Sequence, residues 1–226
     1  MKQSKVAGRT VRAVERRLSV EHGLRPWRRQ GSALDVLILT ILSQNTSDVN
    51  RDKAYARLRE KFPKWEDVLE APLHDVEQAI RPAGLSKQKS PCIKRVLSEI
   101  QGQRGRLSLE FLRARPIDEA LSWLVSFKGV GPKTAACVLV FAFGKPVFPV
   151  DTHIHRITKR LGWINEKTSA DEAHNLLGAL IPDDLKYQFH INLIEHGRNT
   201  CAAQRPKCSS CVVRQFCALY EREIKS

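Results

Sequence analysis

Four cysteines near the C-terminal end of the sequence have the spacing of metal ligands. Cys201, Cys208, Cys211 and Cys217 are separated by six, two and five residues, and the chain has only six cysteines. Zinc modules usually present two Cys-x2-4-Cys pairs that lie a dozen or more residues apart. The irregular run is more typical of a cubane [4Fe–4S] cluster held by four thiolates. A zinc site and unrelated thiols or disulfides are the alternatives, and nothing indicates the secretion that favours disulfides.

A second segment, residues 124–135, predicts a hairpin between two helices. Gly129 and Gly131 flank Val130, and glycines tolerate left-handed or crowded backbone. Val130 can enter the core and fix the turn, and Pro132 suits the first position of the next helix. The N–H groups of the turn then face outward as an anion site, for which a DNA phosphate is the natural ligand in a basic chain.

Two residues near this hairpin could carry chemistry. Lys133 lies one residue into the second helix, where the helix N-terminus and partial burial disfavour the ammonium form and favour a nucleophilic amine. A phosphate contact or a solvated surface charge is the alternative role. Asp151 precedes a helical run and suits an N-cap, and an ionised carboxylate there can also stabilise nearby positive charge. His153 and His155 are expected to pack or hydrogen-bond, because no further ligand spacing completes a metal set.

The charge of the chain points to a polyanionic partner. Net charge is +14 and the isoelectric point is about 9.8. Residues 1–30 and 81–115 each hold nine Lys or Arg against two acids. Separated basic blocks favour nucleic acid, although a generally basic solvated surface is the alternative. The longest apolar runs are far below the roughly 20 residues of a membrane span, and no signal peptide is recognisable. We therefore expect an intracellular protein with no membrane partner, cytoplasmic and nucleoid-associated if the source is prokaryotic.

The elements that position these residues are predicted to be helices. Val11, Val14 and Leu18 form one amphipathic stripe, and Ser32 caps a run over 33–42 that is apolar almost all round. Prolines punctuate the middle of the chain, which fits short helices joined by tight turns. The class is all-α. Further helices are expected at 48–61, 65–70, 73–81, 91–101, 117–126, 134–143, 152–161, 169–180 and 185–196, and a loop at 147–150.

The order of the motifs resembles one family. Gly-Val-Gly-Pro-Lys-Thr-Ala, then Val-Asp-Thr-His, then the four-cysteine run resemble the endonuclease III branch of the helix-hairpin-helix DNA glycosylases, over about residues 10–220. The resemblance implies two helical lobes. One is a six-helix barrel with the hairpin at 26–145. The other, formed by 1–25 and 146–226, joins the N- and C-terminal helices to a [4Fe–4S] cluster. It also implies a monomer that binds double-stranded DNA containing a damaged base or an abasic site.

The resemblance assigns roles to the residues already singled out. Lys133 matches the lysine of members that both remove a base and cut the strand, and Asp151 matches an aspartate that the superfamily uses. The implied activity is base-excision repair by a DNA glycosylase and AP lyase. It acts on flipped, oxidised pyrimidines through a lysine Schiff base and cleaves 3′ of the abasic site by β-elimination. Implied DNA contacts in the hairpin come from Gly129, Val130, Gly131 and Thr134.

Three further DNA contacts are implied by the same resemblance. Leu85 matches a wedge residue that enters the base stack beside the flipped base. The alternative is that Leu85 is an ordinary leucine in a loop. Gln44 and Asn45 occupy the region whose glutamine fills the vacated space in the family. Counting back from Asp48, Asn45 takes the family's glutamine position and Gln44 lies one residue earlier. Either amide could reach the orphaned base, so preference for the opposite base stays open.

Two other functions fit parts of the same pattern. One is a monofunctional mismatch or uracil glycosylase of the same superfamily, against which Lys133 argues because such enzymes usually lack a lysine there. The other is a non-enzymatic iron–sulfur DNA-binding protein, which charge, hairpin and cysteines alone would permit. The pairing of Lys133 with Asp151 discriminates, because a binding protein has no use for it.

Overall fold

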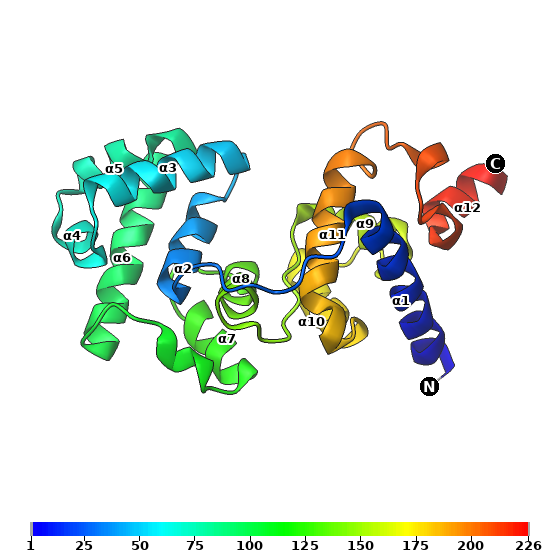
Figure 1. Cartoon of the computed structure of the whole chain (residues 1–226), viewed down its shortest axis with the longest axis horizontal. Helices are drawn as coiled ribbons and strands as arrows, with labels where there is room; N and C mark the ends of the chain where they lie inside the picture. Colours follow the sequence, from blue (N-terminus) through cyan, green and yellow to red (C-terminus); the bar gives the residue numbers. More distant parts are fainter. Residues whose placement is uncertain (1, 226) are drawn as a thin grey trace. The chain divides into compact units, whose positions relative to one another are not determined.

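The computed structural model describes the backbone of residues 2–225 and the side chains of residues 10–222 (Figure 1). No strand occurs in that part of the chain, and the expected all-α class is confirmed. Short 3-10 turns lie at η1 (Arg81–Ala83), η2 (Glu110–Arg113), η3 (Asp183–Leu185), η4 (Cys208–Ser210) and η5 (Arg214–Phe216). The helices are α1 (Lys2–His22), α2 (Ala33–Leu42), α3 (Asp48–Lys61), α4 (Trp65–Glu70), α5 (Leu73–Ile80), α6 (Ser86–Arg104), α7 (Ile117–Val125), α8 (Pro132–Phe143), α9 (Thr152–Arg160), α10 (Ala170–Leu180), α11 (Lys186–Asn199) and α12 (Ala218–Lys225).

The chain folds into two compact units. The hairpin unit is Arg29–Phe143, and the cysteine unit combines Met1–Arg28 with Gly144–Ser226. The first therefore begins three residues after the boundary expected from the sequence and ends two residues before it. No described helix is long and apolar enough to cross a membrane.

Helix α2 is the centre of the hairpin unit. Ser32 and Asp35 form a reciprocal capping box, in which the Asp35 N–H donates to Ser32 Oγ at 3.1 Å and the Ser32 N–H donates to Asp35 Oδ2 at 2.9 Å. The helix packs against α8, and its side chains are buried almost all round, as the sequence predicts. Two helices with little polar surface thus form the core that holds the hairpin.

The cysteine unit is built on a pairing of distant segments. Val11, Val14 and Leu18 on α1 are fully buried in a cluster that also holds Phe148 and Phe189. Helix α1 packs along α11, visible as the blue and orange helices in Figure 1. The apolar stripe read from the sequence therefore joins the N-terminal helix to the C-terminal part of the chain.

One predicted helix start is wrong. A helix was expected to begin at Pro91, but α6 begins at Ser86 and continues to Arg104 with Pro91 inside it. The backbone N–H groups of Gln88 and Lys89 donate to the Leu85 carbonyl oxygen, both at 2.9 Å, and so start the helix a turn and a half earlier. Proline at an interior position removes one backbone hydrogen bond. A helix can include such a proline where its packing against neighbouring helices compensates for the missing bond. Most other predicted ends coincide with the observed ones or differ by one or two residues. Helices α6 and α11 each end three residues past their predicted ends, and α12 was not predicted.

The buried α2–α8 packing predicts where the fold is sensitive. Leu37→Ala removes a fully buried side chain from α2, and we expect it to lower the free energy of unfolding by about 2–5 kcal/mol. Leu73→Ala truncates an exposed leucine in the same unit and is expected to cost less than about 1 kcal/mol. Urea denaturation followed by circular dichroism measures both, and equal losses would contradict the packing described.

Candidate nucleic-acid interface and cysteine pocket

The predicted hairpin connects α7 to α8. The Val130 N–H donates to the Phe127 carbonyl oxygen at 3.0 Å, which closes the turn. Phe127 and Val130 are both buried, so the turn is anchored from inside, as expected. Pro132 is the first residue of α8, also as expected.

Only one of the two glycines is required by the backbone. Gly129 has φ of +101°, and a Cβ added there would overlap Cys92 Sγ on α6. Gly131 lies outside the left-handed region, and a Cβ there would meet open space. The expectation that both glycines serve a left-handed or crowded backbone is therefore wrong for Gly131 and correct for Gly129.

The hairpin offers backbone rather than side-chain contacts to a ligand. Gly129 and Gly131 are exposed, whereas the side chains of Val130 and Thr134 are 3% and 4% exposed. Both side chains are therefore largely covered by the protein, and the DNA contacts implied for Val130 and Thr134 stay predictions. Any contact made by these two residues comes from their main chain.

Lys133 lies at the second position of α8, immediately after the hairpin, and its side chain is half-buried. Within the hairpin unit, no acidic side chain of the described residues pairs with its amine. The amine thus combines partial burial, a helix N-terminus and the absence of a neighbouring carboxylate, a setting in which an amine can react.

Asp151 caps α9 in the cysteine unit, which confirms the N-cap prediction. Its Oδ1 accepts the Ile154 N–H at 2.8 Å, and the side chain is half-buried. The histidines that follow hydrogen-bond, as predicted: His155 Nε2 lies 2.9 Å from the Thr168 carbonyl oxygen, and His153 Nδ1 lies 3.1 Å from Arg156. The cap hydrogen bond fixes the orientation of the Asp151 carboxylate.

The structure places the remaining predicted DNA contacts on two strained loops. Gln44 and Asn45 are exposed after the end of α2, and Asn45 has φ of 52°. Leu85 precedes α6 with φ of 48°, and 46% of it is exposed. Left-handed backbone is uncommon for asparagine and an outlier for leucine, and such strain concentrates at functional sites. Sequence reasoning had no signal for this strain.

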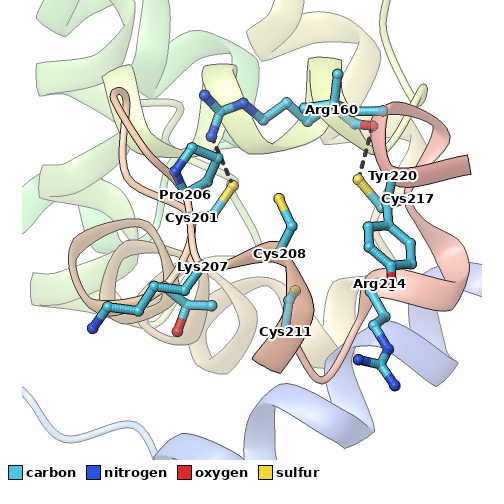
Figure 2. Close-up of a pocket in the computed structure, with 11 residues that line it drawn as sticks. Arg160, Cys201, Pro206, Lys207, Cys208, Cys211, Arg214, Cys217 and Tyr220 are labelled. Carbon is cyan, nitrogen blue, oxygen red and sulfur yellow. Dashed lines mark hydrogen bonds between the residues drawn. The ribbon is translucent and has the colours of Figure 1, made fainter. Parts of the chain in front are cut away.

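All four cysteines near the C-terminus line one pocket (Figure 2). Each of them is half-buried, and none of the six cysteines, all within the described residues, forms a disulfide. The pocket also contains side chains that were not predicted. They are Arg160, Thr200, Pro206, Lys207, Arg214, Leu219 and Tyr220.

Helix α9 holds the cysteine loop through two arginines. Arg160 donates to Cys201 Sγ at 3.2 Å and to the Ala202 carbonyl oxygen at 2.7 Å. Cys217 Sγ donates to the Arg160 carbonyl oxygen at 3.3 Å. Arg156 donates to the Cys201 carbonyl oxygen at 2.7 and 3.0 Å. The sequence signal that could have found them is a pair of arginines four residues apart on the helix that follows Asp151.

The pocket disfavours an isolated thiolate at Cys211. Burial, together with the charges of the other three cysteines, raises the pKa of the Cys211 thiol to about 11. Such a group of thiols gains most from a multivalent cation, which displaces the protons. Within the described residues, no three His, Cys, Asp or Glu side chains converge as the ligands of a single metal ion do.

The chain matches one family of DNA repair proteins. Residues 38–183 match the family described as "HhH-GPD superfamily base excision DNA repair protein". Endonuclease III of Thermotoga maritima is 36% identical over 193 residues, which cover 84% of each chain. The chain belongs to the HhH-GPD superfamily. The predicted family and the coarse function, a base-excision repair glycosylase, are confirmed.

Other relatives extend the comparison. A candidate DNA glycosylase of Arabidopsis thaliana is 45% identical over 74% of this chain, which spans only 57% of that protein. A structure titled as a non-covalent endonuclease III–DNA complex is similar with a TM-score of 0.81 and 29% identity, over 97% of this chain and 99% of the other. A thermostable thymine-DNA glycosylase is similar with a TM-score of 0.78 and 25% identity, over 98% of each chain. The likeness to a DNA complex supports the binding of DNA by this chain.

The two glycines of the hairpin give a matched test of this interface. Gly129→Ala forces a side chain into left-handed backbone against Cys92, and we expect duplex affinity to fall about tenfold, or about 1.4 kcal/mol. Gly131→Ala adds the same methyl group into open space and is expected to change affinity less than about threefold. Fluorescence anisotropy at fixed salt measures both affinities. An equal effect of the two substitutions would contradict the hairpin geometry.

Proposed function

We propose that the protein is a bifunctional DNA glycosylase and AP lyase that removes oxidised pyrimidines from duplex DNA and cleaves the strand at the resulting abasic site. Lys133 carries this proposal. It is a lysine at the N-terminal turn of the helix that follows the hairpin, with no carboxylate partner in its own unit. The oxidised-pyrimidine substrate is supported by the similarity to endonuclease III proteins. The lyase activity and this substrate range are parts of the proposal.

The chemistry assigned to Lys133 is nucleophilic displacement at the sugar. With the damaged nucleotide flipped out of the helix, the neutral Nζ attacks C1′, the glycosidic bond breaks, and the base leaves with the bonding pair. The amine then loses a proton as the sugar ring opens, which gives a C1′ Schiff base. Loss of a C2′ proton expels the 3′ phosphate by β-elimination, and water hydrolyses the imine to release the enzyme.

Asp151 supplies electrostatic stabilisation in the same proposal. Its carboxylate opposes the positive charge that develops on the sugar as the base departs. The N-cap hydrogen bond to Ile154 holds that carboxylate in one orientation. Because the carboxylate is already oriented, it needs little reorganisation when positive charge develops on the sugar.

The cysteine pocket fits a [4Fe–4S] cluster better than a single zinc ion. Four thiols line one pocket, yet no three of them converge as the ligands of one ion do. We therefore assign Cys201, Cys208, Cys211 and Cys217 as cluster ligands. A bound cluster supplies folding energy for the loop, and the chain's own residues perform the reaction. Arg205, Lys207 and Arg214 on this loop add positive charge suited to DNA phosphates.

Two loops of the hairpin unit complete the proposed DNA contacts. Leu85 is assigned as the wedge, because an exposed leucine in left-handed backbone is held in a costly conformation. Gln44 and Asn45 are assigned to the space left by the flipped base. These three residues are called the insertion residues below.

Covalent trapping tests the lyase directly. Borohydride reduces a Schiff base to a stable amine, so wild-type protein incubated with abasic-site duplex is expected to give a covalent adduct. Lys133→Gln is expected to lose the adduct while binding the same duplex within about threefold of wild type. Denaturing gel electrophoresis measures the adduct.

The matched control is Lys128→Gln, which removes the same charge from an exposed position in the same hairpin and should trap like wild type. Absence of an adduct with wild-type protein would leave the monofunctional glycosylase, the alternative suggested by the thymine-DNA glycosylase likeness. In that case, base removal would still be detected after alkaline cleavage of the DNA.

Metal content tests the pocket. Protein purified without oxygen is expected to be yellow-brown, with about four iron and four sulfide per chain. Cys208→Ser is expected to lose most of both, because it removes a ligand from the pocket. Cys92→Ser alters a cysteine outside the pocket and should keep both. Elemental analysis and absorbance measure the content, and stoichiometric zinc in colourless protein grown with ample iron would refute the assignment.

A further inference from the structure

Lys89 is a buried lysine with an unusual pair of partners. It lies on α6, and only 4% of it is exposed. Its Nζ donates to the Leu42 carbonyl oxygen at 2.8 Å and to the Ala83 carbonyl oxygen at 2.9 Å. These acceptors are 47 and 6 residues away in the sequence, so one ammonium group joins two segments that the chain does not connect locally.

The two segments lead directly to the insertion residues. Leu42 is the last residue of α2, and Ser43 alone separates it from Gln44 and Asn45. Ala83 is the last residue of η1, and Gly84 alone separates it from Leu85. Lys89 therefore holds the base of each insertion loop, and it does so within the hairpin unit, where α2 and α6 pack against each other.

The backbone next to Lys89 reinforces this link. The Lys89 N–H donates to the Leu85 carbonyl oxygen at 2.9 Å, so the same residue fixes the wedge through its main chain and the gap-filling loop through its side chain. Leu85 and Asn45 both adopt left-handed backbone, which needs support from surrounding contacts to persist. The ammonium at the C-terminal end of α2 also opposes the negative end of the helix dipole.

The charge of Lys89 is buried without a carboxylate partner among the described residues. Burial lowers the pKa of its ammonium group. A buried charge without a counter-ion is costly even when carbonyl oxygens solvate it. A cost of this kind is tolerated where a precise geometry serves function.

We propose that Lys89 is a positioning residue that sets the spacing between the two insertion loops, so that the wedge and the gap-filling amide enter the duplex together. The proposal rests on the proposed function, because it takes Leu85, Gln44 and Asn45 as the residues that enter DNA. It makes Lys89 a determinant of how the enzyme opens duplex DNA, without contact to the sugar that reacts.

Helix α6 offers a matched control for Lys89. Lys94 Nζ also donates to main-chain carbonyl oxygens, those of Leu69 at 2.7 Å and Ala71, at the C-terminal end of α4. Lys94→Met therefore removes the same kind of link from the same helix, away from the insertion loops. If Lys89→Met acted only by lowering the stability of the fold, Lys94→Met should have a similar effect on DNA opening.

The test uses DNA that cannot react. A duplex carries a tetrahydrofuran abasic analogue opposite 2-aminopurine, whose fluorescence rises when protein side chains unstack it. At saturating protein, we expect a rise of several-fold with wild type and with Lys94→Met, and less than half of that rise with Lys89→Met. Lys89→Arg, which keeps a charged donor, is expected to recover most of the signal. Should Lys89→Met not fold, Lys89→Gln takes its place, because its amide can satisfy one carbonyl oxygen only.

A second readout separates duplex opening from chemistry. Lys89→Met is expected to excise a damaged base from duplex about tenfold more slowly, while incising an abasic site in single-stranded DNA at a rate within about twofold of wild type. An equal loss on both substrates, or full fluorescence with Lys89→Met, would overturn the proposal. A wild-type protein that binds the analogue without a fluorescence change would also overturn it. The proposed glycosylase function would stand or fall separately, on base removal by the wild type.

Discussion

The left-handed backbone at Gly129 is the constraint on which the candidate site depends. Only a residue without a Cβ fits between the turn and Cys92 of α6, and this fit lets the chain reverse within a few residues. Val130 then enters the core, and α8 begins at Pro132. Because Lys133 follows at once, the direction of its amine is set by a turn whose own conformation permits almost no substitution.

Helix N-termini recur at both proposed catalytic positions. Lys133 lies in the first turn of α8, and Asp151 caps α9. At each position the proposed catalytic side chain therefore lies beside the positive end of a helix dipole. Helix α9 additionally ties Asp151 to the cysteine loop, because Arg156 and Arg160 at its other end hold that loop.

Much of this arrangement could be predicted from the sequence, because it depends on local patterns. The apolar stripe of α1, the capped apolar run of α2 and the Gly-Val-Gly turn each follow from periodicity or residue chemistry within a dozen residues. The crowding of four cysteines similarly predicted that they share a pocket.

The remaining features depend on contacts between distant segments, and a single sequence does not encode these in a readable pattern. The preference of proline for the first turn of a helix predicted a helix start at Pro91. In the structure, hydrogen bonds to the Leu85 carbonyl oxygen start α6 earlier, at Ser86. The need for Gly129 but not Gly131 depends on Cys92, 37 residues away in the sequence. Lys89 could not be distinguished from the other lysines of a basic block until its two carbonyl partners were placed.

The proposed chemistry requires that the amine of Lys133 become bonded to C1′ of the sugar. Peptide mapping by mass spectrometry tests this bond, after borohydride reduction of wild-type protein on abasic-site duplex and digestion of both protein and DNA. We expect the sugar remnant on the peptide containing Lys133 and on no other lysine. A remnant on the N-terminal amine or on another lysine, with Lys133 unmodified, would contradict it.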